Sequence, residues 1–457
     1  MNLAGKNILV LGLGDTGLSM VRWLARQGAR VRAADSRESP PHAAKIRAEW
    51  PQVEVRTGAI DAACFAGIDL IAISPGVPLA SLPAAHAPVV GDVELFAQAL
   101  QIPGKTRQAK VIAITGANGK TTVTTLCGAM CQQAGMRTVV AGNIGLPVLD
   151  ALSAIEDGAP MPEVFVLELS SFQLETTASL HADAATVLNV TQDHLDRYAD
   201  MSAYAAAKAR IFAGHGLQLL NREDGYSRAM AVPGRKIASF GLSVPANDAE
   251  WGLASVDGEE WLAQGQQRLL PCKAIPLAGR HNAANALAAL ALCRAIDLPM
   301  APLLNALQNF KGLPHRVEKV AEVGGVVFYD DSKGTNVGAT VAALNGMREP
   351  VVLIAGGEGK GQDFAPLKPA CAAHARALVL IGRDAPLIAA AVAGCGVPLL
   401  NARDMEEAVR LAFQASHAGD AVLLSPACAS FDMFRNYEHR AQVFIAAVQK
   451  LQAERAA

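Results

Sequence analysis

The sequence lacks the hydrophobic runs that mark export or membrane insertion. Its beginning passes from Lys6 directly into a short apolar run that ends in glycines, without the hydrophobic region or small-residue cleavage site of a signal peptide. No apolar stretch reaches the length of a membrane span, and the alanine-rich stretch 283–296 is interrupted by Asn285 and Arg294. We therefore expect a cytoplasmic protein without membrane insertion.

Paired cysteines and a strong net charge are also missing. The eight cysteines form no Cys-x-x-Cys pair and no dense cluster, so neither a zinc ribbon nor a disulfide scaffold is indicated. The net charge is −2, so the chain has no basic field that would attract nucleic acid. Any phosphate binding must therefore be local and depend on a few well-placed groups.

Aromatic and charged residues are scarce, whereas small and aliphatic residues are abundant. Aromatic residues make up 5% and charged residues 18% of the 457 residues, and hydrophobic residues make up 51%. This composition is typical of a well-packed globular protein. Because a single core rarely grows beyond roughly 250 to 300 residues, we expect two or three domains.

Three times along the chain a short aliphatic run is followed by glycines and then by a helix-forming stretch. These restarts lie at 7–17, at 110–122 and from about residue 325 onward. The alternation predicts an α/β fold with parallel sheets. Segments with proline, glycine and polar residues separate the restarts. We place a Rossmann-like domain at 1–106, a P-loop ATPase-like domain at 107–312 and a second Rossmann-like domain at 313–457.

The second restart contains a loop with the composition of a phosphate-binding site. The aliphatic run 111–114 leads into Thr115-Gly116-Ala117-Asn118-Gly119-Lys120-Thr121-Thr122. In such a loop backbone N–H groups converge on an anion, the lysine adds a cation and a hydroxyl can bind Mg²⁺. The usual motif has a glycine where Ile114 stands, so this loop is a shortened variant. An ordinary glycine turn would seldom have this sequence directly after a strand, so we predict nucleotide binding.

The first restart contains a weaker glycine motif. Gly12-x-Gly14-x-x-Gly17 follows the run 8–11, and Asp35 lies near the end of the next predicted strand. Alone, this spacing predicts NAD binding and an oxidoreductase. That alternative would leave the phosphate loop without a role, and a uridine diphosphate group would fit the same glycines. Asp15 adds a negative charge next to the expected diphosphate.

Polar residues also stand where further strands are expected to end. They lie in the segments 142–145, 167–173 and 189–196 and at Lys208. Glu168 is placed to bind Mg²⁺, which prefers carboxylates, hydroxyls and phosphate oxygens, and His194 is a candidate ligand for a second ion. Each residue alone would more often be structural, but beside an ATP loop they indicate phosphoryl transfer. A protein that only binds a nucleotide remains an alternative.

These motifs occur in the order found in the Mur (muramyl peptide) ligases, whose last two domains resemble those of folylpolyglutamate synthetases. The sequence resembles this family over nearly its whole length, through the segments 115–122, 142–145, 168–173, 189–194 and 313–316. It is most similar to the members that add D-glutamate, through the segments 331–336, 356–360 and 425–432. The Asp-Asn-Pro-Arg motif of members that add a diamino acid is missing. Another Mur-type or folylpolyglutamate-type ligase remains the alternative within the family.

The resemblance implies an ATP-dependent ligase of peptidoglycan precursor synthesis. Its substrates would be UDP-N-acetylmuramoyl-L-alanine and D-glutamate, joined through an acyl phosphate with release of ADP and phosphate. The implied contacts to the UDP substrate are Thr16, Asp35, Ser36, Arg37, Gly76, Asn143, Ser170 and Gln173. The implied contacts to ATP are residues 115–122, Asn282, Arg316 and Asp331. The implied contacts to D-glutamate are Thr335, Lys360, Ser430, Phe431 and Tyr437, the last often a phenylalanine in the family.

The resemblance also implies two Mg²⁺ ions and a modified lysine. The implied metal ligands are Thr121, Glu168, His194 and Lys208. Lys208 would act as a carbamate, because an ammonium group would repel Mg²⁺. The implied catalytic residues are Lys120, Asn143, His194, Lys208, Arg316 and Lys333. Because the contacts come from three domains, we expect the last domain to close over ATP and exclude water, and we expect an open form without ligands. We also expect a monomer.

Overall fold

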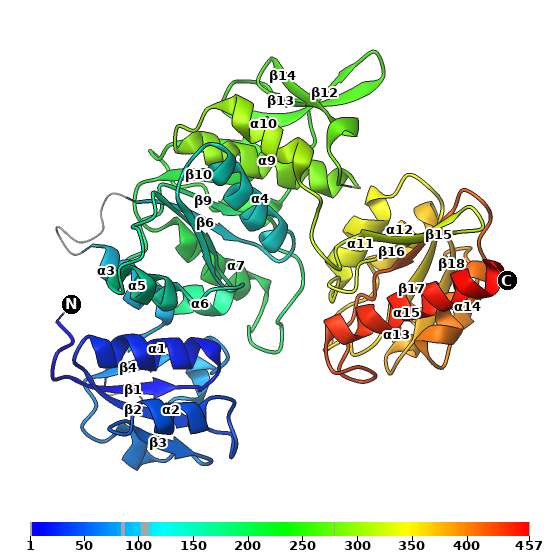
Figure 1. The fold of residues 1–457 in the computed structure, drawn as a ribbon. Coiled ribbons are helices and arrows are strands. Elements are labelled where there is room, and N and C mark those ends of the chain that lie inside the picture. The colour runs from blue at the N-terminus through cyan, green and yellow to red at the C-terminus, as the bar shows by residue number, and fades with distance from the viewer. Residues whose placement is uncertain (1, 84–86, 102–108, 278, 457) are drawn as a thin grey trace.

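The computed structural model describes residues 2–83, 87–101, 109–277 and 279–456. Three sheets follow one another along the chain, each flanked by helices (Figure 1). We call the parts of the chain that carry them the first unit (2–101), the central unit (109–312) and the third unit (313–456). The expected three-part α/β fold is confirmed. The boundary expected at 106/107 falls outside the described residues, and both expected boundaries stay predictions.

The first unit is a parallel sheet with strand order β3-β2-β1-β4-β5. Its strands are β1 (Asn7–Leu11), β2 (Arg30–Asp35), β3 (Glu54–Thr57), β4 (Leu70–Ile73) and β5 (Val89–Val90), and its helices are α1 (Asp15–Arg26), α2 (Ala43–Glu49) and α3 (Asp92–Leu100). The chain turns tightly from β1 into α1. A Cβ atom at Gly17 would lie 1.8 Å from the carbonyl oxygen of Gly12, so only glycine fits there.

The central unit is a nine-stranded sheet with strand order β14-β13-β12-β11-β10-β9-β6-β8-β7. Its strands are β6 (Lys110–Thr115), β7 (Thr138–Gly142), β8 (Val164–Glu168), β9 (Ala184–Val187), β10 (Leu217–Asn221), β11 (Ile237–Phe240), β12 (Glu250–Val256), β13 (Glu259–Gln264) and β14 (Gln267–Pro271). Its helices are α4 (Lys120–Gln133), α5 (Val148–Glu156), α6 (Ser171–Glu175), α7 (Met201–Ala209), α8 (Gly225–Ala229), α9 (Arg280–Ala295) and α10 (Met300–Asn309). All five residues of β8 are buried, as expected for a strand covered on both faces.

The third unit is a six-stranded sheet with strand order β15-β16-β20-β17-β18-β19. Its strands are β15 (Glu318–Val323), β16 (Val326–Asp330), β17 (Val351–Gly356), β18 (Ala375–Ile381), β19 (Leu399–Asn401) and β20 (Ala421–Leu424). Its helices are α11 (Val337–Gly346), α12 (Leu367–His374), α13 (Ala385–Ala391), α14 (Met405–Gln414) and α15 (Tyr437–Ala456). Two apolar cores lie in this unit, and both include residues of β17, β18 and β20.

Two parts of the sheets are antiparallel, a feature that the expected parallel α/β architecture did not include. β12, β13 and β14 pair antiparallel, and so do β15 and β16. The β12–β13 connection is Asp257-Gly258, with φ of 51° and 79°, and the β15–β16 connection is Gly324-Gly325, with φ of 58° and 79°. Two-residue turns with positive φ join antiparallel strands, so these dipeptides carried a hairpin signal.

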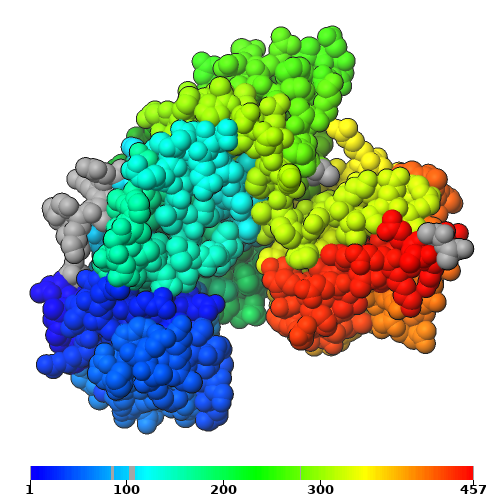
Figure 2. Space-filling model, in the orientation of Figure 1, coloured from blue at the N-terminus to red at the C-terminus, as the bar shows by residue number. Residues whose placement is uncertain are grey.

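The first unit contacts the central unit through charged side chains of α1, of α5 and of the residue that follows α5. Arg22 and Asp150 form an ion pair at 2.7 Å, and Arg26 and Asp157 form another at 2.7 Å. In the view of Figure 2, the surfaces of the first unit (blue) and the third unit (yellow to red) flank the central unit, with a hollow between them. No helix in the described ranges is long and apolar enough to cross a membrane.

Candidate active site

The carboxyl ends of three neighbouring strands bring the central motifs to one edge of the sheet. β6 lies between β8 and β9, with Ile114 paired to Glu168 on one side and to Thr186 on the other. The phosphate loop follows β6, Glu168 ends β8, and Asn189 lies two residues beyond the end of β9. Parallel sheets place their ligand sites at such an edge. The predicted metal and phosphate residues therefore share one location.

The phosphate loop is held by side chains and its own lysine. Asn189 binds the backbone of Asn118 on both sides, since its Oδ1 accepts from the Asn118 N–H at 2.8 Å and its Nδ2 donates to the Asn118 carbonyl at 3.0 Å. Lys120 Nζ bends back over the loop and donates to the carbonyls of Gly116 and Ala117 at 2.9 and 3.0 Å. Burial lowers the pKa of Lys120 from its ordinary value. The loop is thus preformed at the start of α4.

Glu168 offers a carboxylate oxygen that is suited to a cation. The residue is 1% exposed, and its Oε1 accepts a hydrogen bond from Asn143 Nδ2 at 2.8 Å. Its Oε2 is buried and has no hydrogen-bond partner among the described residues. A buried unpaired carboxylate oxygen is unfavourable unless a positive charge compensates it. Glu168 therefore fits the predicted Mg²⁺, and Thr121 stands on the neighbouring first turn of α4.

Lys208 is the most deeply buried of the basic residues in the predicted site. It lies on α7, is 1% exposed, and donates to the Gly116 carbonyl at 2.9 Å. Its Nζ lies 4.5 Å from the ring centroid of Tyr204. Burial, and next the charge of Lys120, hold the pKa of Lys208 well below its ordinary value. A neutral amine is the form that can react with carbon dioxide, so this environment is compatible with the predicted carbamate.

His194 is held in the left-handed region of the backbone, with φ of 57°. Its ring packs against Phe172, with the ring centroids 4.7 Å apart. Asp193 Oδ1 accepts the His194 backbone N–H at 3.0 Å, and Asp193 Oδ2 lies 3.7 Å from His194 Nε2. Burial lowers the pKa of His194, which favours the neutral ring that can serve as a metal ligand.

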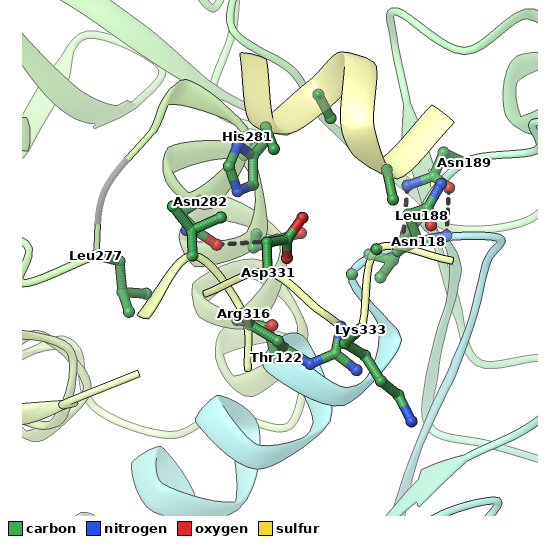
Figure 3. Close-up of a pocket in the computed structure, with 18 of the residues that line it drawn as sticks. Asn118, Thr122, Leu188, Asn189, Leu277, His281, Asn282, Arg316, Asp331 and Lys333 are labelled. Carbon is green, nitrogen blue, oxygen red and sulfur yellow. Dashed lines mark hydrogen bonds between the residues drawn. The ribbon is translucent and has the colours of Figure 1, made fainter. Parts of the chain in front are cut away.

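A cavity of about 270 Å³ lies between the central and third units (Figure 3). Seven residues with predicted roles are among those that line it: Asn118, Gly119, Thr122, Asn282, Arg316, Asp331 and Lys333. Burial raises the pKa of Asp331 to about 7. Burial, and next the charge of Arg316, lower the pKa of Lys333 to about 8. The predicted ATP contacts from two distant parts of the chain therefore meet at one cavity.

Arg316 makes a direct contact between the third unit and the phosphate loop. Its Nη2 donates to Thr121 Oγ1 at 2.7 Å. The preceding residue, His315, is fixed by a hydrogen bond between its Nδ1 and Asp330 Oδ2 at 2.6 Å. The guanidinium group is thus directed at the hydroxyl that was predicted to bind Mg²⁺.

The residues predicted to contact D-glutamate lie on loops of the third unit. Lys360 shares a small hollow with His194, and Lys333 Nζ lies 3.6 Å from the ring centroid of Tyr437. Ser430 is buried, whereas Phe431 is 70% exposed. Thr335 is half-buried in the loop before α11.

Arg440 joins two of these loops and was missed by the sequence analysis. It is 1% exposed, and it donates to the carbonyl of Ser332 at 2.8 Å and to the carbonyl of Cys428 at 3.0 Å. Ser332 Oγ in turn donates to the carbonyl of Tyr437 at 2.8 Å. Nothing in the local sequence separates Arg440 from an exposed helical arginine, because its burial arises from packing against both loops.

The predicted substrate residues Ser170 and Gln173 form a capping box at the start of α6. Gln173 Nε2 also donates to Asp92 Oδ2 at 3.2 Å, which links the central unit to α3 of the first unit. Asp92 is 1% exposed, and burial raises its pKa to about 6. The sequence analysis did not select Asp92, because its partner lies 81 positions away.

In the first unit, Asp35 ends β2 and faces the glycine turn. Its Oδ2 accepts from the backbone N–H of Leu13 at 2.7 Å and from Arg37 Nη2 at 2.6 Å. Burial alone would raise the pKa of Asp35, but these hydrogen bonds outweigh it and hold the pKa at about 2. Asp15 is paired with His42, whose Nε2 lies 2.7 Å from Asp15 Oδ1. The predicted residues Thr16, Ser36 and Gly76 lie on the loops or helix start at the same carboxyl ends of β1, β2 and β4.

Comparison with protein families covers all three units. Residues 6–92 match the Mur ligase MurD-like N-terminal domain, residues 114–293 the Mur ligase middle domain and residues 315–428 the Mur ligase glutamate ligase domain. The UDP-N-acetylmuramoylalanine--D-glutamate ligase of Thiobacillus denitrificans is 59% identical, with 100% of this chain and 98% of that protein covered. The protein of the same name from Nitrosospira multiformis is 58% identical, with 100% and 98% covered.

Solved structures share the fold at much lower identity. A pseudomurein peptide ligase type C from Methanothermus fervidus has a TM-score of 0.58 at 17% identity, with 98% of this chain and 100% of that chain covered. The UDP-N-acetylmuramate-alanine ligase of Thermotoga maritima has a TM-score of 0.57 at 18% identity, with 97% and 99% covered. The matched domains and the full-length relatives show that the chain belongs to the Mur ligase family.

Proposed function

We propose that this protein is the ATP-dependent ligase that joins D-glutamate to UDP-N-acetylmuramoyl-L-alanine in peptidoglycan precursor synthesis. Full-length relatives that carry this activity in their names support the assignment. The structural observation that carries it is the cavity in which the phosphate loop of the central unit meets Arg316, Asp331 and Lys333 of the third unit. Such a site can bind ATP and present it to a second substrate.

In the first step, a carboxylate oxygen of the alanyl group attacks the γ-phosphorus of ATP and ADP leaves. The product is a mixed anhydride of the alanyl carboxylate and phosphate. The reactants are both anions, so the residues must hold them together against their repulsion. Lys120 and the loop N–H groups would hold the phosphates, and Arg316 and Lys333 would stabilise charge on the transferred phosphoryl group.

Two Mg²⁺ ions fit this scheme and would be held by residues of the central unit. Thr121 and Glu168 would hold one ion, and His194 and carbamylated Lys208 the other. When bound, these ions would supply positive charge for the phosphate and carboxylate oxygens. The carbamate is testable with ¹³C-bicarbonate, since a carbamate carbon resonance is expected in the native protein and not in the Lys208→Ala variant.

In the second step, the amine of D-glutamate attacks the carbonyl carbon of the anhydride, loses a proton and displaces phosphate. Lys360, Thr335 and Ser430 would bind the two carboxylates of D-glutamate, together with the backbone near Phe431 and Tyr437. Asn143, Ser170 and Gln173 would orient the muramoyl substrate from the central unit. The third unit would cover the site and keep out water, which would otherwise hydrolyse the anhydride.

The uridine diphosphate group would bind to the first unit. Thr16, Asp35, Ser36, Arg37 and Gly76 are the proposed contacts, at the carboxyl ends of β1, β2 and β4. We place the enzyme in the cytoplasm, where ATP and nucleotide-activated sugars are available. We also propose a monomer, since one chain supplies all of the proposed contacts, and light scattering in solution tests this.

The test is phosphate release from ATP with UDP-N-acetylmuramoyl-L-alanine and different amino acids, with product mass as a second readout. Phosphate release and the mass increase of one glutamyl residue are expected with D-glutamate and not with L-glutamate, L-alanine or a diamino acid. Ligation of another amino acid would keep the mechanism but overturn the assigned specificity. Absence of ligation with every amino acid would overturn the proposed function.

A further inference from the structure

Asn336 is a residue of the third unit whose side chain lies against the central unit. It has no role in the reaction scheme proposed above. It is 4% exposed and precedes α11 as its N-cap residue. Its Oδ1 accepts the backbone N–H of Ala339 at 2.8 Å. Asparagine is a common N-cap, so this contact alone describes an ordinary structural residue.

The remaining contacts of the Asn336 amide cross to the central unit. Its Nδ2 donates to Asn118 Oδ1 at 3.0 Å and to Asp193 Oδ2 at 3.3 Å. Its Oδ1 also accepts from Asn118 Nδ2 at 3.3 Å. A primary amide has two N–H donors and an oxygen with two lone pairs, so all four positions are used. Three of the four bonds exist only while the third unit is docked.

Both partners of Asn336 belong to segments that carry proposed catalytic residues. Asn118 lies in the phosphate loop two positions before Lys120, and Asn189 holds its backbone. Asp193 directly precedes His194 and accepts the His194 backbone N–H at 3.0 Å. The amide therefore joins the phosphate loop and the histidine segment to the third unit.

The first turn of α11 has no spare room where it meets the central unit. A Cβ atom at Gly338 would lie 2.7 Å from Thr191 Oγ1. Thr191 Oγ1 accepts a hydrogen bond from Asn118 Nδ2 at 3.2 Å. The first turn of α11 therefore lies directly against the segment that contains Thr191 and Asp193, and a shift of α11 away from it would break the bonds of the Asn336 amide to Asn118 and Asp193.

We propose that Asn336 is a positioning residue that couples docking of the third unit to the geometry of the phosphate loop and the His194 segment. It acts through Asn118 and Asp193 and does not touch the reacting atoms. This inference rests on the proposed ligase function, because its effect is read in the rate of ligation. Loss of the amide should lower kcat while the KM for the UDP substrate, which binds to other residues, stays nearly constant.

The test compares variants that keep the helix cap and lose the amide donors. Asn336→Ser retains an oxygen that can cap α11, and Asn336→Asp retains the cap but places a carboxylate against Asn118 Oδ1 and the carboxylate of Asp193. We expect kcat to fall about tenfold in Asn336→Ser, as for the loss of buried hydrogen bonds, and further in Asn336→Asp. The KM for UDP-N-acetylmuramoyl-L-alanine should change less than about twofold.

A cap on the far side of the same unit provides the matched control. Asp404 is the N-cap of α14 and accepts the Glu407 N–H at 2.8 Å in an exposed position. Asp404→Ala should lower the melting temperature without changing kcat. If Asn336→Ser behaves like Asp404→Ala, with lower stability and unchanged kcat, Asn336 is only a cap and the inference is overturned.

A second pair of variants keeps the inference testable if the Asn336 variants fold poorly. Asn118→Ala removes the partner and leaves the α11 cap intact, so it should reproduce the fall in kcat. Asn118→Ala combined with Asn336→Ser should lose less than the product of the two single effects, because both act through one contact. Losses in the double variant that equal the product of the two single effects would contradict the coupling.

The outcome for the proposed function can be told apart from the outcome for this inference. Wild-type enzyme that fails to ligate D-glutamate overturns the proposed function. Active wild-type enzyme together with an unaffected Asn336→Ser variant overturns this inference alone.

Discussion

The central unit meets its two neighbours through contacts of different kinds. Against the first unit, Arg22 and Arg26 of α1 form ion pairs with Asp150 of α5 and with Asp157, which follows α5. Neither helix carries a proposed catalytic residue. Against the third unit, the contacts are made by the proposed catalytic machinery itself, as in the Arg316 bond to Thr121. The ion pairs of α1 can therefore hold the first unit in place without affecting the chemistry, although Asp92 of α3 also binds Gln173, a proposed substrate contact. Docking of the third unit, in contrast, completes the proposed site.

This contrast gives a physical reason for the expected open and closed forms. The third unit docks onto polar groups that are also the proposed ligands for phosphate and metal, so we expect docking and ligand binding to depend on each other. The α1–α5 contacts involve no such groups. We expect the third unit to move when ATP binds and the first unit to follow the central unit more closely.

The largest effect is expected at the interface between the central and third units, from Arg316→Ala. This change removes the bond to Thr121 Oγ1 and the positive charge proposed to stabilise the transferred phosphoryl group. We expect kcat to fall roughly 10²- to 10³-fold, as for removal of one donor that stabilises transition-state charge. Steady-state ligation assays measure this fall. A loss confined to the KM for ATP would show that Arg316 only binds the nucleotide.

The second prediction concerns the charge of Lys333, whose pKa burial lowers to about 8. An amine is charged below its pKa and neutral above it, so kcat/KM for ATP should decline as the pH rises through about 8. Lys333→Arg keeps its charge over this range, so its remaining activity should lack that decline. An identical decline in Lys333→Arg would assign the titration to another group.

The third prediction concerns Asp92, which joins the first unit to Gln173 of the central unit. Burial raises the pKa of the Asp92 carboxyl from 3.8 to about 6. Between pH 4 and pH 6, this carboxyl is therefore more protonated in the folded protein than in the unfolded chain. The ionised carboxylate therefore lowers stability above pH 6, and this penalty disappears below pH 4. Asp92→Asn should be more stable by up to about 3 kcal/mol at pH 8 and show no gain at pH 4. Thermal unfolding at both pH values tests this, and a less stable variant at pH 8 would contradict it.

The smallest effect is expected from Arg26→Ala at the first interface. The Arg26–Asp157 pair is at 2.7 Å, but its side chains are 34% and 62% exposed. Exposed ion pairs contribute at most about 1 kcal/mol, so stability should change little and kcat should not change. A fall in kcat comparable to that of Arg316→Ala would remove the distinction between the two interfaces.

The sequence was informative where function depends on local geometry. The phosphate loop and Glu168 were predicted from their place after strands, and Arg316 and Lys333 from the family resemblance. The structure places these residues around one cavity or at one sheet edge. Their roles in binding and catalysis stay predictions. The hairpin turns at Asp257-Gly258 and Gly324-Gly325 were also visible in the sequence, but the expectation of parallel sheets overlooked them.

Three buried polar residues could not be predicted, because their roles arise from contacts distant in sequence. Asp92 binds Gln173, Arg440 binds Ser332, and Asn336 binds Asn118 across 218 positions. Asp92 begins a helix, and Arg440 lies within one, in stretches of ordinary helical pattern. Asn336 ends the segment 331–336 and fits an ordinary helix cap. Only the packing of helices and loops on the sheets shows that these side chains are buried and which groups they hold.

In the proposed mechanism, ATP phosphorylates the alanyl carboxylate before the amine of D-glutamate attacks. The most direct test uses UDP-N-acetylmuramoyl-L-alanine with ¹⁸O in the alanyl carboxylate, ATP and D-glutamate, followed by mass analysis of the released phosphate. The acyl-phosphate route predicts transfer of one labelled oxygen from the carboxylate to phosphate in each turnover. Phosphate without label would contradict it, and label in AMP would show activation by adenylate transfer instead.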